Sequence, residues 1–236
     1  MTDINLVNLR NVPILQQLQL EEALLRVDSE NWCIINYGSP QAVVMGISAK
    51  PEKLLQRAVV EKMNIPVIKR FSGGGTVVVD PDTVFVTFIC NENSLNVPSY
   101  PEPVMRWSDS FYRGVFSNTE FALRENDYVF GDRKFGGNAQ YMRKGRWLHH
   151  TSFLWDFDCR SMECLKIPEK MPIYRQSRSH NGFLCKLRDQ FPTKDLLRER
   201  IRKELLSTFD VQERSYEDVY DIPHKPHRKA TCLVEI

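Results

Sequence analysis

The central part of the chain is dense in β-branched and aromatic residues, and this constrains the fold most. Residues 76–80 and 83–90 both read as strands, and Pro81-Asp82 between them is a turn signal. This pattern predicts a hairpin. A second set of strands follows at residues 127–130, 133–143 and 146–155, with turns at Gly131-Asp132 and Lys144-Gly145. The centre of the chain therefore predicts a largely antiparallel sheet.

Helical patterns lie before and after these strands. Apolar residues recur at helical spacing in four stretches: residues 13–27, 51–63, 103–117 and 193–208. Shorter apolar runs at residues 32–37 and 42–46 predict a pair of strands, and another strand begins at Ile65. Consecutive hairpins with helices around them predict an α+β fold with a mixed, mainly antiparallel sheet. No repeat or linker divides the chain, so we expect residues 1–236 to form a single catalytic domain.

Composition excludes several functional classes. Thirty-two Lys and Arg against thirty Asp and Glu give a net charge of +2, which offers no reason to expect nucleic acid as a partner. No apolar run reaches the ~18 residues of a membrane span, so we expect no membrane partner. The six cysteines form no CxxC pair, which predicts free thiols in a reducing compartment. The N-terminus resembles no targeting segment, which favours the cytoplasm; mitochondria or plastids stay open if a transit peptide is missing.

The sharpest feature is a run of three glycines between two strands. It reads Lys69-Arg70-Phe71-Ser72-Gly73-Gly74-Gly75-Thr76-Val77-Val78. Consecutive glycines cost conformational entropy and make sense where a backbone must approach a ligand closely. Their amides suit an anion, and Arg70 adds a charge suited to phosphate or carboxylate. The run matches neither a Walker A motif nor a dinucleotide fingerprint. A flexible hairpin connection is the alternative.

A second glycine-lined stretch carries a lysine. Lys134 lies on a predicted strand beside Gly136-Gly137, and His149-His150 lies on the next strand. A strand lysine is usually solvated, but beside these glycines it becomes a candidate cation for an acyl carbonyl or a phosphate. Adjacent histidines point to opposite faces of a strand, which argues against a metal centre made of both. No cluster predicts a metal site.

Together these segments resemble the lipoate–protein ligase A family, within the biotin/lipoate ligase superfamily. The family's Arg-Arg-x-Ser-Gly-Gly-Gly-x-Val motif and following acid are matched by Lys69, Arg70, Ser72–Gly75, Val77 and Asp80. Its Asn-Asp and Gly-Arg-Lys motifs are matched by Asn126, Asp127 and Asp132-Arg133-Lys134, with Gly136, Gly137 and Ala139 following. Its His-His segment with a threonine is matched by His149, His150 and Thr151. The resemblance implies a catalytic domain of the class II aminoacyl-tRNA synthetase/biotin ligase type.

The resemblance also implies a chemistry. Family members join lipoate and ATP, with Mg²⁺ on the triphosphate, to form lipoyl-adenylate. They then pass the acyl group to a lysine of a lipoyl-acceptor domain in a 2-oxoacid dehydrogenase complex or the glycine cleavage H protein. By this resemblance Lys134 is the catalytic residue, and Gly137, Asn138 and His149 contact the acyl group. Likewise, ATP or acyl-adenylate would be bound by Arg70, Ser72, Gly73, Gly74, Gly75, Thr76, Val77, Val78, Asn126, Asp127 and Lys134.

Some positions depart from the family pattern. Lys69 replaces the first arginine, and Gly46-Ile47-Ser48-Ala49 lacks the usual polar residues. Many ligases of this family also carry a smaller C-terminal domain of roughly 80 residues. We expect none here, so a separate accessory subunit could supply that function. Arg175, Arg178 and His180 are expected to border the entrance of the site.

Two other functions stay open. One is an octanoyl or lipoyl transferase that takes its acyl group from a carrier without ATP; the segment 118–125 contains no cysteine nucleophile, which disfavours one such mechanism. The other is a family member that has lost turnover. The retained Arg70, glycine run and Lys134 argue against this second alternative.

Overall fold

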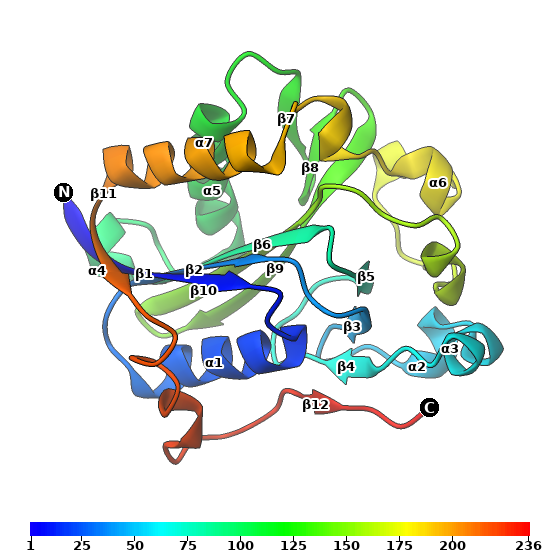
Figure 1. The fold of residues 1–236 in the computed structure, drawn as a ribbon, viewed down its shortest axis with the longest axis horizontal. Coiled ribbons are helices and arrows are strands. Elements are labelled where there is room, and N and C mark those ends of the chain that lie inside the picture. Colours follow the sequence, from blue (N-terminus) through cyan, green and yellow to red (C-terminus); the bar gives the residue numbers. More distant parts are fainter.

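The computed structural model describes all 236 residues of the chain and contains two β-sheets flanked by helices (Figure 1). The larger sheet has eight strands in the order β11-β1-β2-β6-β10-β9-β8-β7, and the smaller has four in the order β12-β4-β3-β5. The strands are β1 (Thr2–Arg10), β2 (Trp32–Tyr37), β3 (Ala42–Met45), β4 (Val67–Lys69), β5 (Val77–Val79), β6 (Thr83–Asn91), β7 (Phe121–Arg124), β8 (Asp127–Phe130), β9 (Arg133–Arg143), β10 (Arg146–Leu154), β11 (Phe209–Arg214) and β12 (Cys232–Leu233).

Most strand pairs are antiparallel. The parallel pairs are β1 with β11, β1 with β2, and β3 with β4. Strands β8, β9 and β10 form the predicted meander in consecutive antiparallel pairs. These pairings confirm the predicted α+β fold with a mixed, mainly antiparallel sheet.

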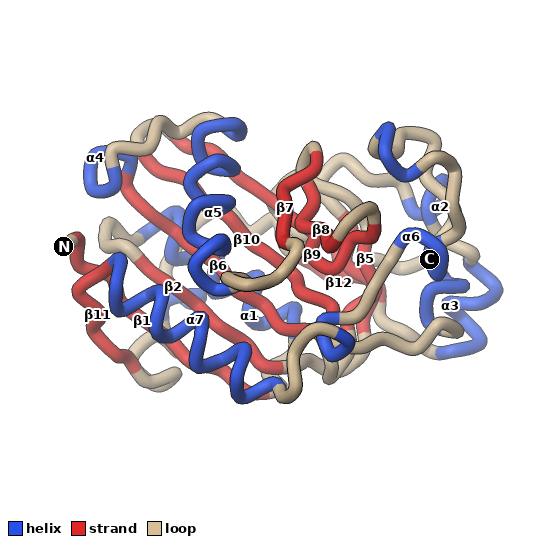
Figure 2. The backbone as a smooth tube through the Cα atoms, turned by 90° about the horizontal axis from the view of Figure 1, so that it is seen from above, coloured by secondary structure: helices blue, strands red, loops and turns tan.

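Helices cover both faces of the larger sheet (Figures 1 and 2). Helix α1 (Ile14–Val27) packs on one face, and α5 (Pro101–Val115) and α7 (Lys194–Thr208) pack on the other. Thr193 caps α7 by accepting a hydrogen bond from the Leu196 amide at 3.2 Å, which fixes where the helix begins. The shorter helices are α2 (Pro51–Leu54), α3 (Arg57–Met63), α4 (Glu92–Leu95) and α6 (His180–Phe183).

Side-chain alternation along β10 separates two cores. Trp147 joins the cluster beneath α5 and α7, whereas the next residue, Leu148, joins the cluster beneath α1. The first cluster is largely aromatic. Since successive side chains of a strand point to opposite faces, this single strand contributes to both cores.

The predicted hairpin of residues 76–80 and 83–90 is wrong. The turn forms, because the Thr83 amide donates to the Asp80 carbonyl at 3.1 Å. The two strands then enter different sheets: β5 pairs with β3, and β6 pairs with β2 and β10. The glycine run is not a hairpin connection either, because β4 and β5 lie on opposite sides of β3. Tertiary pairing here overrides a local turn signal.

Other departures are smaller. The strands predicted as a pair at residues 32–37 and 42–46 lie in separate sheets, and the helix predicted over 51–63 is broken at Leu55-Gln56. The N-terminal strand β1 was not predicted, although it lies inside the larger sheet. The C-terminal tail adds the two-residue strand β12 to the edge of β4. No helix has the length and apolarity that crossing a membrane requires.

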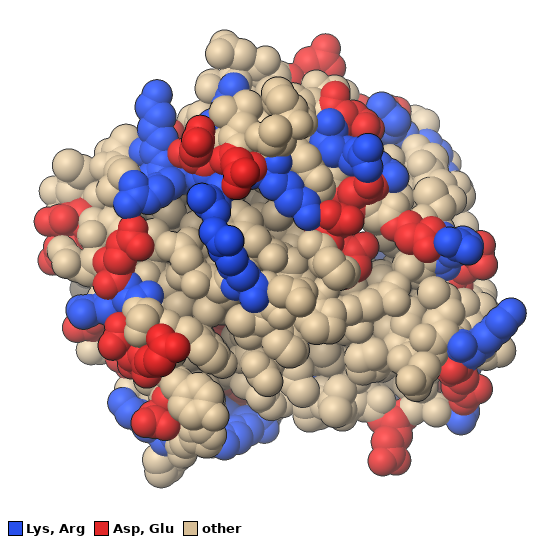
Figure 3. All heavy atoms as spheres, viewed as in Figure 1, with Lys and Arg blue, Asp and Glu red and all other residues tan.

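On the molecular surface seen in Figure 3, basic and acidic side chains lie together along the upper part and the margins, around a broad uncharged centre. Neither sign dominates this face, in keeping with the near-zero net charge of the chain.

Candidate functional site

A cavity of about 1030 Å³ opens between the glycine run, strand β9 and the segment that follows β10. It brings together both glycine-lined stretches identified in the sequence. The predicted site residues that line it are Gly73, Gly74, Gly75, Thr76, Val77, Val78, Asn126, Asp127, Lys134, Gly137 and Asn138. Residues 73–78 and 126–138 are far apart in the chain, so the fold itself creates this proximity.

A smaller cavity of about 60 Å³ adjoins the first. Gly75, Thr76, Val77 and Lys134 line both cavities, so the two meet at the lysine. The walls of the smaller cavity are mostly apolar beyond that junction; they include Ile14, Leu18, Val44, Val79 and Phe85.

Glycine is required at the middle of the run. Gly74 has a φ of +107°, and a Cβ there would lie 2.7 Å from Nη2 of Arg70 and 3.1 Å from the Asn138 carbonyl oxygen. The Gly73 amide donates to the Gln140 carbonyl at 3.3 Å, which fixes the run against β9. A Cβ on Gly75 would meet nothing within 4 Å, so the backbone there faces open space.

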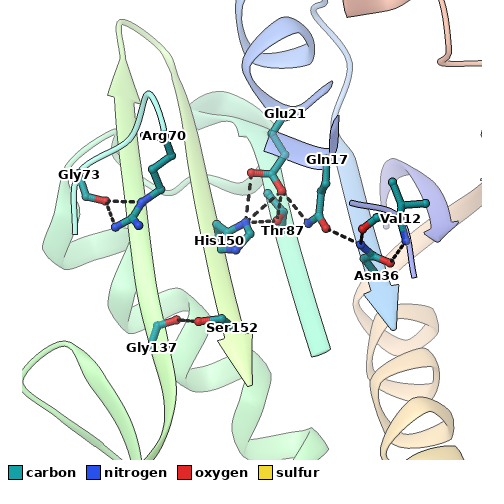
Figure 4. A network of polar contacts seen from close by, with 10 residues as sticks. All are labelled: Val12, Gln17, Glu21, Asn36, Arg70, Gly73, Thr87, Gly137, His150 and Ser152. Atoms are coloured by element: carbon teal, nitrogen blue, oxygen red, sulfur yellow. Dashed lines mark hydrogen bonds and ion pairs between the residues drawn. The ribbon is translucent and has the colours of Figure 1, made fainter. Parts of the chain in front are cut away.

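Arg70 supports this loop from inside. Its guanidinium donates from Nη2 to the carbonyls of Gly73 at 2.9 Å and Gly75 at 2.8 Å. Nε donates to the Gly73 carbonyl as well, and Figure 4 shows the contacts with Gly73. The side chain is only 4% exposed, and burial lowers the pKa of Arg70 to about 10. Arg70 reaches the smaller cavity but does not line the larger one. Its visible task is to hold the glycine loop in shape.

Ser72 lies outside both cavities. It is buried, and its carbonyl accepts a hydrogen bond from the Ile47 amide at 3.0 Å. The structure therefore places Ser72 in support of the loop, away from the space that a ligand would occupy.

Lys134 points into the junction of the cavities as part of an ion pair. Its Nζ lies 2.7 Å from Oδ1 of Asp127, and the hydroxyl of Tyr174 donates to Oδ2 of Asp127 at 2.8 Å. A Cβ on Gly137 would come within 3.1 Å of Nζ, so the glycine leaves room for the amine. A bulge where β8 pairs with β9 displaces the register near Lys134. The result is a partly exposed cation between an apolar and an open compartment.

The two histidines lie on opposite faces of β10, as predicted, and His149, the predicted acyl contact, does not line the site. His149 is fully buried against Tyr128 and Gln140, at 3.3 and 3.0 Å, and lines neither cavity. Burial lowers the pKa of His149 to about 3, with a smaller effect from the neighbouring His150. His150 lines the smaller cavity instead.

Family comparison identifies the chain at this point. The family model of the lipoyl protein ligase A/B catalytic domain matches residues 13–210. This chain belongs to that family.

Two curated relatives are each 26% identical to this lipoyl ligase family member over the aligned region. The inactive lipoate–protein ligase 2 of Plasmodium falciparum aligns over 81% of the chain and 66% of its own length. The lipoate-protein ligase LplJ of Bacillus subtilis aligns over 82% of the chain and 60% of its own length. The chain thus spans less than two thirds of either relative.

Solved structures share the fold at lower identity. A bi-partite lipoate protein ligase from Thermoplasma acidophilum, studied with its E2 lipoyl domain, has a TM-score of 0.78 at 18% identity and covers 95% of this chain and 92% of its own. Lipoate-protein ligase A bound with ATP has a TM-score of 0.75 at 16% identity, with coverages of 95% and 93%. Both confirm the predicted α+β fold.

A buried polar network behind the smaller cavity was missed by the sequence interpretation. The carboxylate of Glu21 lies 3.0 Å from Nδ1 of His150 and accepts hydrogen bonds from Thr87 and Gln17, both at 2.8 Å (Figure 4). Glu21 is completely buried. The available signal was its position among Leu20, Ala23 and Leu24 on the packed face of α1, where an acid needs partners.

The segment after β10 supplies further polar groups. Arg175 and His180 line the larger cavity, as expected, while Arg178 pairs with Asp132 at 2.9 Å outside it. Arg175 is buried, and its Nη2 has no hydrogen-bond partner. Burial, followed by the charges of Arg175 and Lys134, lowers the pKa of His180 to about 4. Arg175 is therefore a second cation available to a bound anion.

The residues that line the two cavities include no cluster of metal ligands and no thiol. No group of three or more His, Cys, Asp and Glu side chains is arranged to hold a metal ion. All six cysteines are free, and none lines either cavity.

Proposed function

We propose that this chain activates lipoate with ATP and transfers the lipoyl group to a lysine of an acceptor protein. The single observation that carries the proposal is that Lys134 stands where a small cavity, walled largely by apolar side chains, meets a larger, open cavity lined by the glycine run and Arg175. The apolar walls of the smaller cavity suit one end of an acyl chain, and the larger cavity has room for a nucleotide. The acyl carboxylate and the α-phosphate would then meet at the lysine amine.

Adenylation needs what this junction offers. The lipoate carboxylate attacks the α-phosphorus and forms a new O–P bond. The bond from that phosphorus to the oxygen that bridges to the β-phosphate breaks, and pyrophosphate leaves with the electron pair. Negative charge builds on the phosphate oxygens, and preorganised cations and amides stabilise it. Lys134 and the backbone of the glycine loop are the groups placed to do so, with Arg175 as a second cation. Mg²⁺ would enter with the triphosphate as part of the substrate.

Transfer follows at the same place. The acceptor lysine amine attacks the acyl carbonyl, an amide bond forms, and AMP leaves. The proposed acceptor is a lipoyl domain of a 2-oxoacid dehydrogenase complex or the glycine cleavage H protein. The Thermoplasma acidophilum ligase is described as bi-partite, which supports a separate accessory subunit as a further proposed partner.

One other function keeps a specific observation in its favour. The Plasmodium falciparum relative is named inactive, so a member of this family that binds without turnover is the second candidate. An acyl transferase that uses a cysteine nucleophile has no such support, because no thiol faces either cavity.

Pyrophosphate release is the test. The chain is incubated with ATP, Mg²⁺ and lipoate, alone and with the accessory subunit, and pyrophosphate is followed before a lipoyl domain is added. Lipoate-dependent pyrophosphate and a lipoyl mass increase on the domain are expected. Modification only from a lipoyl or octanoyl carrier thioester, without pyrophosphate, would indicate a transferase. Binding without either product would indicate the inactive alternative.

A further inference from the structure

We propose that Tyr174 is a positioning residue for Lys134, acting through Asp127. Its hydroxyl holds the Asp127 carboxylate so that the lysine amine can exchange this partner for substrate. The inference rests on the proposed function for its purpose, because the substrate groups are those of the acyl phosphate. The geometry on which it is built is independent of that function.

The Asp127 carboxylate serves two donors from different elements. Oδ1 faces Nζ of Lys134 at 2.7 Å, and Oδ2 accepts from Tyr174 at 2.8 Å. The carboxylate is largely buried, since Asp127 is only 7% exposed. Burial and the adjacent Asp127 charge raise the pKa of Tyr174, so its hydroxyl keeps the proton that it donates.

Tyr174 is fastened to the strands that carry the site. The amide of its neighbour Ile173 donates to Glu125 at 2.8 Å, and Arg178 donates to the Tyr174 carbonyl at 2.8 Å. The ring packs against Phe183 with centroids 5.2 Å apart. Further along the same segment, the Cys185 amide donates to the Lys134 carbonyl at 2.8 Å. Tyr174 therefore stays beside Asp127 whatever Lys134 does.

This arrangement solves an electrostatic problem. Lys134 must give up Asp127, at least in part, before its amine contacts a phosphate or an acyl carboxylate. A buried carboxylate left without a donor is costly. With Tyr174 in place Asp127 keeps one charge-assisted hydrogen bond, so releasing the amine costs less. Without the hydroxyl the carboxylate would hold Lys134 more tightly.

Amine labelling measures how tightly the Asp127 carboxylate holds the Lys134 amine. The folded chain is acetylated with N-acetoxysuccinimide, and the rate of modification at Lys134 is followed by peptide mass spectrometry. In Tyr174→Phe we expect labelling about tenfold slower than in wild type, in line with a lost hydrogen bond to a charged group. Ile173→Ala, in the same segment, is the matched control and should leave the rate within about twofold. An unchanged or faster rate in Tyr174→Phe would overturn the proposal, because the hydroxyl would then not help to release the Lys134 amine from Asp127.

A double-mutant cycle separates positioning from packing. In an Asp127→Asn background, Tyr174→Phe should change the labelling rate less than about twofold, because the charge through which it acts is gone. An equal effect in both backgrounds would reduce Tyr174 to a packing residue and reject the inference.

Activity is read alongside. Tyr174→Phe is expected to lower kcat/KM for ATP about tenfold, an effect that should also vanish beside Asp127→Asn. If wild type releases no pyrophosphate, the proposed function fails while the labelling cycle still decides the role of Tyr174.

Discussion

The two faces of the eight-stranded sheet are packed differently, and the adjacent residues His149 and His150 mark the difference. Beneath α5 and α7, His149 lies beside a core of stacked and edge-on aromatic rings, such as Trp107 stacked on Phe111 and edge-on to Phe88. Beneath α1, His150 contacts the buried acid Glu21 and lines a cavity. The face beneath α5 and α7 is close-packed, whereas the face beneath α1 contains a cavity and buried ionisable side chains.

This difference separates stability from function. A close-packed core tolerates little change in volume. A face that buries an acid, a histidine and a cavity carries a cost that a ligand site would justify. Lys134 belongs to this second face, since its amine lies beside Gly137, whose cross-strand partner is Ser152 of β10. Substitutions on the two faces should therefore fail in different assays.

Lys134→Ala should give the largest effect. Loss of one preorganised charge donor lowers adenylation by about 10²–10³-fold. The thermal unfolding midpoint should change little, because the side chain is partly exposed and Tyr174 still holds Asp127. Pyrophosphate release and differential scanning calorimetry measure the two quantities. Near-normal transfer by this variant would remove Lys134 from the chemistry.

Much of this face was predictable, and the reasons are particular. The glycine run and a lysine beside Gly-Gly are local features that can be recognised in the sequence. Two of the segments that line the larger cavity could therefore be identified before the fold was known. The separation of β5 from β6 was not predictable, because a turn signal at Pro81-Asp82 does not say which sheet each strand enters. His149 was predicted from the family resemblance, and strand alternation could not test it, because alternation reveals opposite faces but not which of them holds a cavity. Tyr174 carried no local signal, since only the fold brings it to Asp127.

Gly74→Val should give the next largest effect. Valine strongly disfavours the left-handed φ of +107°, and its Cβ would press on the Arg70 guanidinium. ATP and lipoate should both bind about 10–100-fold more weakly by isothermal titration calorimetry. Gly73→Ala is the matched control: its Cβ would meet only the Gln140 carbonyl at 3.9 Å, so binding should stay within about threefold. Unchanged affinities in Gly74→Val would reduce the run to a connector.

Replacing each histidine in turn compares the two faces directly. His150→Ala should weaken lipoate binding about tenfold, because it alters the wall of the smaller cavity and leaves Glu21 short of a donor. His149→Ala should leave lipoate affinity nearly unchanged and lower the free energy of unfolding instead, because it empties space in a packed core. Lipoate titrations and urea unfolding of both variants decide the matter. If both variants lose affinity equally, the assignment of faces is wrong.

The pH dependence of stability gives the smallest and most specific signature of the packed face. His149 stays neutral in the folded chain down to its pKa of about 3, whereas an unfolded histidine protonates near pH 6.5. Between these values the unfolded state binds the extra proton, so stability falls as pH is lowered. His149→Gln should remove up to about 1.4 kcal/mol per pH unit of this slope between pH 6 and 4. Urea unfolding of both proteins at pH 7, 6, 5 and 4 measures the difference. Equal slopes would mean that His149 takes up its proton in the folded state, which would contradict its complete burial beside the aromatic core.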